Sequence, residues 1–320
     1  MKPPYRITNK ILNLISSISE KIGEVKSARL IKPPTELRKR NRIKTIQSSL
    51  EIEGNTLTIE QITDLINDIR VLAPQKDIIE VKNAINVYSK LNKFQAYDIN
   101  SLCSAHKILM DKLVDNAGKL RNTAVGIMKG DQIAHIAPPG AMVHPLLNDL
   151  FKYLKEDDDI ILLKSCVFHY EFEFIHPFVD GNGRMGRLWQ TMILKEYSPV
   201  FEFLPVETLI KEKQQEYYNA LAKSDGQGES TLFIEFMLDI INSALEDLLK
   251  TQRSSSTNND RIEIFKDLIG ISEFSRQDYM RHNKDISSAT ASRDLKNAVE
   301  NGELIKLGDK RLTKYKYNKN

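Results

Sequence analysis

Twelve consecutive residues, His176 to Arg187, gather the side-chain types that bind phosphate groups and act on them. They read HPFVDGNGRMGR and contain one histidine, one aspartate, one asparagine, two arginines and three glycines. Histidine takes up a proton near neutral pH, so it suits the role of a general base. Arginine binds phosphate oxygens through a planar fork of donors. The segment therefore points to chemistry at a bound phosphate, with His176 as the base.

The spacing within this segment favours a polyphosphate ligand. Gly181 and Gly183 allow the backbone to turn tightly before a helix that begins near Arg184. Unpaired amides at a helix N-terminus, together with the helix dipole, attract anions. Arg184 and Arg187 are three residues apart, so both guanidinium groups leave the same side of the first turn. Asp180 adds a hard oxygen ligand, as Mg²⁺ bound to phosphates requires.

A structural explanation of the same residues is the main alternative. A single His, Asp or Arg is more often a surface or capping residue than a catalytic one, and a glycine-rich loop alone is weak evidence. The loop is not a Walker P-loop, because no Gly-Lys-Ser/Thr follows, and it lacks the acidic ligands of an EF-hand. Because base, metal ligand, anion-binding amides and two arginines occur together, we favour a functional site.

Composition excludes several other classes of protein. The 320 residues carry a formal net charge of +3 and are 41% hydrophobic, which is ordinary for a soluble globular protein. No apolar run approaches the ~20 residues of a membrane helix, and the N-terminus does not resemble a signal peptide, so we expect a cytoplasmic protein without membrane contact. Cys103 and Cys166 are too far apart for a paired motif, and the six histidines lack zinc-ligand spacing.

The elements that must position these residues are mainly helices. Apolar residues recur at spacings of three and four along most of the chain. The segments concerned are 8–22, 58–72, 78–91, 100–114, 145–154, 160–174, 184–195 and 231–249. Thr58 and Gln61 have the spacing of a capping box. The prediction is a mainly α fold in which the motif joins two buried helices.

Two segments interrupt the helical pattern. Val125 to Ile136, VGIMKGDQIAHI, places short apolar stretches around KGDQ and predicts a β-hairpin. Such a hairpin is marginally stable by itself, so we expect it to have a purpose. The second segment is Thr251 to Asp260, TQRSSSTNND, which has no apolar anchor and predicts a flexible linker between domains.

The tail, residues 261–320, resembles a winged helix. Helical patterns over 261–268, 275–282 and 287–301 precede two short strands around a Gly-Asp turn. The tail has 13 Lys and Arg against 9 Asp and Glu, a balance of +4. A patch of this charge suits either a protein partner, including a second copy in a homodimer, or the phosphate backbone of DNA. We favour protein docking slightly, with DNA binding close behind.

A second unusual segment, SSLEIEGNTLT, spans Ser48 to Thr58. In a helix, one face would carry Ile46, Ser49, Leu50 and Glu53. A carboxylate that turns inward with apolar residues needs a partner. The local alternative is a helix that ends at a Gly54 cap, with Glu53 paired to a nearby arginine such as Arg42.

The motif His176 to Arg187 resembles the signature HPFx(D/E)GNGRxxR of the Fic (filamentation induced by cAMP) family, with every position matched. The resemblance continues in FHYEFEFI, AGKLRNTAVGI and YYNALAKSDGQGE, and covers roughly residues 36–250. Most Fic proteins are helical and transfer AMP from ATP to a protein hydroxyl, with release of pyrophosphate. The resemblance implies an N-terminal helical region over 1–99 and a Fic core over 100–250. The linker, 251–260, and the winged-helix-like domain, 261–320, would follow.

The resemblance also implies roles for individual residues. His176 would deprotonate a Ser, Thr or Tyr of the target protein, and Asp180 would hold Mg²⁺. Arg184 and Arg187 would contact the β- and γ-phosphates. The full ATP site that the family implies comprises Gly181, Asn182, Gly183, Arg184, Arg187, Tyr217 and Asp225, the last two near the nucleoside. The family commonly has Asn where this chain has Asp225.

In Fic proteins the hairpin is a flap whose edge aligns an extended target segment by strand addition. The flap residues implied here are Val125, Gly126, Ile127 and Met128. Ser49, Glu53 and Gly54 match the inhibitory motif (S/T)xxxE(G/N), on a helix of about 36–54. In the family this Glu pairs with the second motif arginine, here Arg187, and obstructs the γ-phosphate. The expected activity is self-inhibited transfer of AMP to a target or to the protein itself.

Two alternatives from other functional classes stay open. The same site could remove AMP or transfer another phosphate-containing group, with Glu53 orienting a water molecule. The chain could instead be a transcription regulator whose tail binds DNA.

Overall fold

The computed structural model describes residues 2–27, 35–124, 126–129, 132–254, 258–269, 272–283, 286–309 and 313–318. The chain divides into two compact units, Met1–Asp247 and Leu248–Asn320. The first unit contains the motif His176 to Arg187, and the second contains the tail after the predicted linker.

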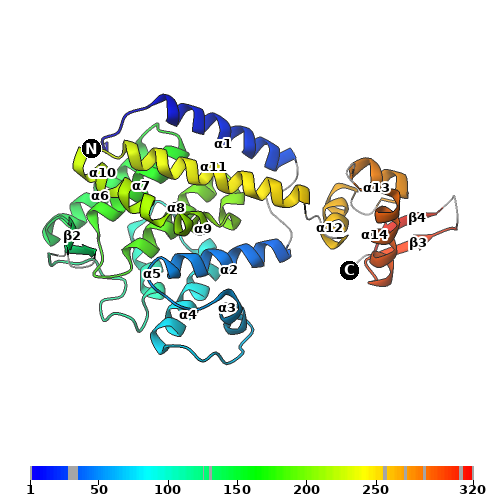
Figure 1. Ribbon diagram of the computed structural model, residues 1–320, viewed down its shortest axis with the longest axis horizontal. Helices are drawn as coiled ribbons and strands as arrows, with labels where there is room; N and C mark the ends of the chain where they lie inside the picture. The colour runs from blue at the N-terminus through cyan, green and yellow to red at the C-terminus, as the bar shows by residue number, and fades with distance from the viewer. Residues whose placement is uncertain are drawn as a thin grey trace. The chain divides into compact units, whose positions relative to one another are not determined.

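The first unit is built from helices with short connections between them (Figure 1). The helices that lie or begin in this unit are α1 (Asn9–Ser27), α2 (Thr35–Glu51), α3 (Ile59–Ile66), α4 (Gln75–Ser89), α5 (Ile99–Leu109), α6 (Gly140–Glu156), α7 (Ile161–Ile175), α8 (Asn182–Tyr197), α9 (Val206–Glu212), α10 (Gln214–Gln227) and α11 (Thr231–Ser254). Short 3-10 turns occur at η1 (Leu91–Lys93) and η2 (Pro199–Phe203). The predicted mainly α fold is confirmed.

The helices α7 and α8 lie at the centre of the first unit. Both are buried on almost all sides, as expected of helices enclosed by other helices. Phe168, Phe172 and Trp189 are inaccessible to solvent. Truncating one such aromatic side chain to alanine costs about 3–5 kcal/mol, so dense packing strongly determines where these two helices lie. The loop between them, residues 176–181, is therefore held at both ends by the core.

Helix α2 lies against α4, α8 and α9. Its apolar residues Ile46 and Leu50 are buried. At its C-terminal end, Ser48 Oγ lies 3.1 Å from Thr208 Oγ1, and Lys211 Nζ lies 2.8 Å from Glu51 Oε1. The last turns of α2 are thus docked on α9 by both apolar and polar contacts.

The predicted capping box at the start of α3 is confirmed. The Thr58 side chain accepts a hydrogen bond from the Gln61 amide, and the Gln61 side chain accepts one from the Thr58 amide. The end of α2 differs from the prediction, because the helix stops at Glu51 rather than near residue 54. The Asn55 amide donates to Leu50 O, and Gly54 has φ 92°, a conformation that glycine adopts readily. Glu53 therefore lies in the turn after the helix.

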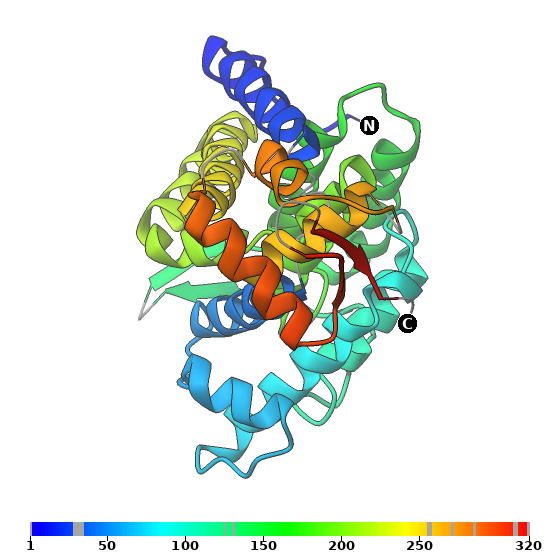
Figure 2. The same ribbon diagram turned by 90° about the vertical axis from the view of Figure 1, so that its right-hand side faces the viewer.

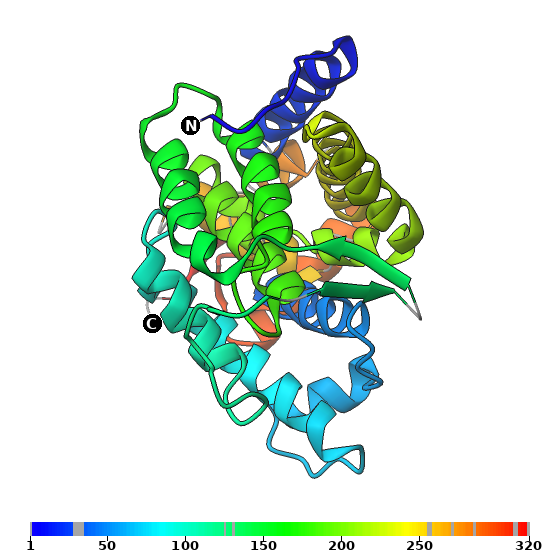
Figure 3. The same ribbon diagram turned by 90° about the vertical axis from the view of Figure 1, so that its left-hand side faces the viewer.

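A β-hairpin, formed by β1 (Gly126–Lys129) and β2 (Gln132–Ile136), projects from the helical core (Figure 3). The strands are antiparallel, with Gly126 opposite Ile136, and their register shifts between Ile127 and Met128. The hairpin appears where the two short apolar stretches around KGDQ predict it. Val125, the first predicted flap residue, lies outside the described residues.

The second unit contains α12 (Asn258–Ile269), α13 (Arg276–His282), α14 (Ser288–Glu300), β3 (Leu304–Leu307) and β4 (Lys314–Tyr317). The strands β3 and β4, drawn in red in Figure 2, are antiparallel, and β3 packs against α14. A single bridge joins Phe274 to Tyr315. The core of the second unit includes Phe265, Phe274, Tyr279, Leu295 and Tyr317. The order of elements follows the prediction for the tail, and the winged-helix assignment stays a prediction.

Regular helix occupies part of the predicted linker, 251–260. Helix α11 continues to Ser254, and α12 begins at Asn258. The contact-defined division of the chain falls between Asp247 and Leu248. Among the described residues, no helix is both long enough and apolar enough to cross a membrane.

Candidate active site

The loop between α7 and α8 reverses the chain through two left-handed residues. His176 follows α7 directly and has φ 50° and ψ 61°, and its amide donates to Phe172 O at 2.9 Å. Gly181 has φ 82° and precedes the first turn of α8. This conformation is natural for glycine, whereas it costs a residue with a Cβ roughly 1–2 kcal/mol. His176 is held in it by the packed helices on either side of the loop.

Asn182 closes the loop with its side chain. Its Oδ1 accepts a hydrogen bond from the Phe178 amide, and its Nδ2 donates to Phe178 O, each at 2.9 Å. Both polar atoms of the Asn182 amide group are therefore engaged in shaping the loop. The amides of the first turn of α8, Asn182 and Gly183 among them, have no partner within the helix and form its positive end.

Asp180 is the carboxylate of the loop, and its side chain is 52% exposed. Its Oδ1 accepts a hydrogen bond from the Gly181 amide at 2.6 Å and one from Arg184 Nη2 at 3.2 Å. No group of three or more His, Cys, Asp or Glu suited to a metal ion is found among the described residues. A metal at Asp180 would therefore need ligands from a bound phosphate, as the sequence argument assumed.

Arg184, the first arginine of the motif, is paired with a carboxylate from a distant helix. Its Nη1 donates to Glu80 Oε1 on α4 at 3.0 Å, and both side chains are almost completely buried. Its Nη2 reaches Asp180 across the loop. Nothing in the spacing of the sequence pointed to Glu80, which lies 104 residues before Arg184.

Arg187, the second arginine, is buried and bound to the end of α2. Its Nη2 donates to Glu53 Oε1 at 2.8 Å and to Ser49 O at 2.9 Å, and its Nε donates to Ser49 Oγ at 3.1 Å. Burial, the largest single effect, lowers the pKa of Arg187, but the charge and hydrogen bond of Glu53 together with the nearby Tyr217 and Glu173 raise this pKa above its ordinary value. The guanidinium is thus fixed by three hydrogen bonds that it donates to two residues of one segment, Ser49 and Glu53.

The local alternative partner for Glu53 is not used. Arg42 instead donates to Tyr88 O at 2.7 Å and to Glu202 Oε1 at 3.0 Å. The Glu53 carboxylate lies directly over the first turn of α8, because a Cβ built on Gly183 would come within 2.5 Å of Glu53 Oε1. A side chain at this position of the motif would require the Glu53 carboxylate to shift.

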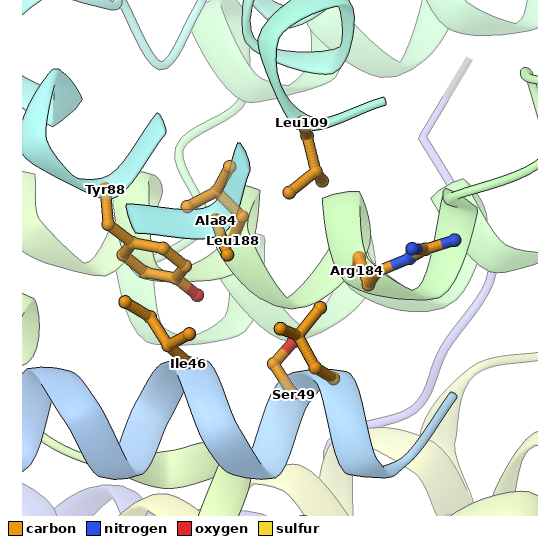
Figure 4. A pocket seen from close by; sticks show the side chains of 8 residues that line it. Ile46, Ser49, Ala84, Tyr88, Leu109, Arg184 and Leu188 are labelled. Atoms are coloured by element: carbon orange, nitrogen blue, oxygen red, sulfur yellow. The ribbon is translucent and has the colours of Figure 1, made fainter. Parts of the chain in front are cut away.

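A small, mostly apolar cavity lies between α2 and α8 (Figure 4). Ile46 and Ser49 line it from α2, and Leu188 and Arg184 line it from α8. Figure 4 shows the guanidinium of Arg184 at the edge, directed away from Tyr88. The packing between the end of α2 and α8 is therefore incomplete next to Arg184.

His106, on α5, packs against the loop between α7 and α8. Its ring stacks on Phe178 with centroids 3.6 Å apart. Nδ1 accepts a hydrogen bond from the Gly118 amide at 2.8 Å, so Nε2 carries the proton and donates to Asp180 O at 3.0 Å. Burial, with a further contribution from the charge of Arg184, lowers the pKa of His106 to about 4. The ring is therefore neutral at physiological pH and acts as a fixed support.

Arg121 joins the loop to both ends of the hairpin. Its Nε donates to His176 O at 2.6 Å, and its Nη2 donates to Ile175 O at 2.9 Å and Pro138 O at 2.8 Å. Its Nη1 donates to Thr123 O at 2.6 Å. The Thr123 and Pro138 carbonyls flank the hairpin, so one guanidinium fixes the hairpin relative to His176. This residue lies in the quoted segment AGKLRNTAVGI, but no pattern there indicated its role.

Tyr217, predicted near the nucleoside, is a buried residue of α10. Its hydroxyl lies 3.1 Å from His169 Nε2, and His169 Nδ1 lies 2.7 Å from Gln190 Oε1. Burial lowers the pKa of His169 to about 3, so this ring is neutral. Tyr217 on α10 is thus connected to α7 through His169, and His169 is connected to α8 through Gln190.

Asp225, the other residue predicted near the nucleoside, lies near the end of α10. It accepts a hydrogen bond from the Tyr170 hydroxyl at 2.9 Å. Burial, followed by the charge of Asp225, raises the pKa of Glu171 to about 7. Tyr217 and Asp225 thus both lie on α10 beside α7, and Tyr217 is also close enough to Arg187 to contribute to the pKa of that guanidinium.

Comparisons with known proteins agree with this architecture. The Fic/DOC family model matches residues 96–194. A crystal structure of a Fic family protein from Desulfovibrio desulfuricans G20 is 40% identical and superposes with a TM-score of 0.75, covering 99% of this chain and 98% of that one. Fic-1 of Caenorhabditis elegans shares the fold with a TM-score of 0.62 at 18% identity, over 77% of this chain and 73% of that one.

Two named enzymes are similar over shorter stretches. A probable protein adenylyltransferase of Aquifex aeolicus (strain VF5) is 33% identical over 153 residues, 46% of each chain. The protein adenylyltransferase Fic of Nematostella vectensis is 26% identical over 249 residues, 72% of this chain and 56% of that protein. The chain thus spans about half the length of these relatives. With 40% identity over almost the whole of both chains, the Desulfovibrio structure settles the family: this chain belongs to the Fic family.

Proposed function

We propose that this protein is a self-inhibited protein adenylyltransferase, which transfers AMP from ATP to a Ser, Thr or Tyr hydroxyl of a target protein or of itself. The observation that carries the proposal is the contact between the motif and α2: a complete HPFVDGNGRMGR loop covers the N-terminus of α8, while Glu53 holds its last arginine. The names of the relatives support the reaction class.

The N-terminal turn of α8 supplies the anion site of the proposed reaction. The amides of Asn182 and Gly183 lie at the positive end of the helix and suit the phosphates of ATP, and the Gly181 amide, which here donates to Asp180, lies next to them. Arg184 and Arg187 follow on the same helix and would neutralise the charge that grows on the departing pyrophosphate. Tyr217 and Asp225, on α10, would lie near the nucleoside.

His176 acts as the base in this proposal. It takes the proton from the target hydroxyl, whose oxygen then forms a bond to the α-phosphorus. The bond from the α-phosphorus to the oxygen that bridges to the β-phosphate breaks, and pyrophosphate leaves with that oxygen. Arg121 contributes indirectly, because it holds the His176 carbonyl and both hairpin ends in one arrangement.

The residues present fit a magnesium ion. Mg²⁺ is commonly bound by one or two carboxylates together with substrate phosphates, and Asp180 offers a half-exposed carboxylate beside the amides of the first turn. A bound ion would neutralise negative charge on the phosphates. Asp180 itself is oriented by the Gly181 amide and Arg184, so its position is fixed before any ligand arrives.

Inhibition in this proposal follows from the occupied Arg187. A γ-phosphate needs the guanidinium that Glu53 and Ser49 hold, and it would approach the negative charge of Glu53. Gly54 allows the turn that brings Glu53 over Gly183. ATP would then bind in a form unsuited to transfer until α2 moves.

The hairpin would align the target. The free edge of β1, with Gly126, Ile127 and Met128, offers backbone groups to an extended segment by strand addition. The second unit, with its balance of +4 over 261–320, would provide a docking surface for a protein, a second copy of the chain or DNA.

The test is transfer of label from α-³²P-ATP to protein. Wild type should incorporate little label, Glu53→Gly should incorporate it readily into itself or into lysate proteins, and Glu53→Gly with His176→Ala should incorporate none while still binding ATP. Label from γ-³²P-ATP should not be transferred. Transfer of the γ-label, or equal α-labelling with and without His176, would rule out the proposed reaction.

A further inference from the structure

The two arginines of the motif are held by carboxylates that differ in solvent exposure. Arg187 is paired with Glu53, which belongs to the turn after α2 and is 30% exposed. Arg184 is paired with Glu80 of α4, and this carboxylate is only 6% exposed. A buried pair resists separation, because removing one partner leaves an uncompensated charge in the interior. Movement of α2 can therefore free Arg187, while Arg184 keeps its partner.

Glu80 uses both carboxylate oxygens. Oε1 accepts from Arg184 Nη1 at 3.0 Å, and Oε2 accepts from Asn55 Nδ2 at 2.8 Å. The other end of the guanidinium, Nη2, donates to Asp180. Arg184 is thus held between a rigid buried carboxylate and the loop, which fixes the direction in which its remaining donors point.

The contact with Asn55 extends this arrangement to the turn that carries Glu53. Asn55 Nδ2 also donates to Asp77 O at 3.1 Å, and Asp77 Oδ2 accepts from the Thr56 amide at 3.0 Å and from Thr56 Oγ1 at 2.7 Å. Both acidic residues lie on α4 and anchor the same turn, but of the two only Glu80 contacts Arg184. They therefore form a natural pair of test and control positions.

We propose that Glu80 is a positioning residue, which holds Arg184 beside Asp180 so that its guanidinium faces the β-phosphate of the bound nucleotide. This inference rests on the proposed function, because it assumes that the nucleotide phosphates lie at the N-terminus of α8. Without the charge of Glu80, Asp180 is the carboxylate that remains within reach of Arg184. The guanidinium then turns toward Asp180 and loses its alignment with the β-phosphate.

The experiment compares binding of ADP and AMP by calorimetry without Mg²⁺, in the Glu53→Gly protein, where the carboxylate no longer holds Arg187. AMP lacks the β-phosphate, so it reports on the rest of the site. Glu80→Gln should weaken ADP binding about tenfold and leave AMP binding within about twofold. Asp77→Asn, which loosens the same turn without touching Arg184, should leave the ADP-to-AMP ratio unchanged. Adding Glu80→Gln to Arg184→Gln should cause no further loss.

Equal losses for ADP and AMP, or tighter ADP binding, in Glu80→Gln would overturn the inference. So would the same ADP loss in Asp77→Asn. If Glu80→Gln does not fold by thermal melting, Glu80→Asp replaces it: it keeps the charge on a shorter side chain and should still lower the ADP-to-AMP ratio, and an unchanged ratio would contradict the inference. Failure of the proposed function is recognised separately, because the Glu53→Gly parent would then transfer no AMP.

Discussion

Arg187 and Glu53, 134 residues apart in sequence, are joined by a hydrogen bond of 2.8 Å between Nη2 and Oε1. The pair sits over Gly183, where the first turn of α8 begins to expose its amides. It connects the end of α2 to the loop that we propose as the active site. Because this contact is an ion pair, substitution of either residue tests the proposal of self-inhibition.

Removing the carboxylate should activate the protein through Arg187 specifically. Glu53→Gly is expected to raise AMP incorporation at least tenfold over wild type, an increase equivalent to about 1.4 kcal/mol in the activation barrier. Glu53→Gly with Arg187→Ala should return to the wild-type level, because the released guanidinium is the group that acts. The measurement is AMP incorporation at equal protein and ATP. Full activity in the double variant would show that Arg187 is not the target of inhibition.

Ser49 should contribute to inhibition through its hydroxyl. The Ser49 Oγ accepts from Arg187 Nε, and a hydrogen bond to a charged group contributes about 1.5–3 kcal/mol. Ser49→Ala should therefore show partial activity, below that of Glu53→Gly. Ser49→Thr keeps the hydroxyl and should remain silent in the same assay. If Ser49→Ala is as silent as Ser49→Thr, the hydroxyl has no part in holding Arg187.

Asp180 should account for the metal requirement. In the Glu53→Gly protein, Asp180→Ala is expected to lose transfer together with its response to added Mg²⁺, because a single carboxylate holds the proposed ion. A titration of transfer rate against Mg²⁺ concentration compares the two proteins. An identical titration curve in both would remove Asp180 from the metal site.

Arg121 should be needed for transfer but not for ATP binding. Replacing it with Gln leaves several carbonyls around His176 and the hairpin without a charged donor, and the loss of stability is expected to be roughly 2–3 kcal/mol. In the Glu53→Gly protein, kcat should fall while ATP affinity measured by calorimetry stays close to that of the parent. A parallel loss of affinity would mean that Arg121 acts on the nucleotide site instead.

Glu207 should make stability depend on pH. It is buried on α9, close to Tyr88 of α4, Thr45 of α2 and Arg187 of α8, and burial raises its pKa to about 7. Because the pKa of Glu207 is higher in the folded protein than in the unfolded chain, the folded state binds its proton more tightly. This contribution to the free energy of unfolding is fully present below pH 4.5 and is lost as the pH rises through about 7. Glu207→Gln cannot ionise, so its melting temperature relative to wild type should increase between pH 5 and pH 8. A constant difference would show that Glu207 titrates normally.

The local features were predictable because they depend on neighbouring residues. The hairpin, the Thr58–Gln61 capping box and the helix that follows the motif loop each follow from spacing or turn-forming residues. The end of α2 was placed too late, because Gly54 terminates the turn and not the helix itself. Helix boundaries depend on which carbonyl accepts the last amide, and composition alone does not determine that.

The supports of the site could not be read from the sequence. Glu80, His106 and Arg121 reach the motif only through tertiary contacts, across 104, 74 and 55 residues respectively. Each is an ordinary residue of its own helix or loop, without a distinctive neighbour pattern. The motif indicates which side chains face a ligand. The charged groups and carbonyls that hold those side chains in place are brought to them only by the fold.

The left-handed conformation of His176 places two demands on one position. The turn after α7 suits a glycine, which adopts positive φ without steric cost, whereas the histidine side chain there carries a penalty of roughly 1–2 kcal/mol. The fold alone would favour glycine, and the proposed chemistry requires an imidazole. The folded state is therefore less stable with histidine at position 176 than it would be with glycine. A substitution of His176 by glycine would raise thermostability and remove the proposed base.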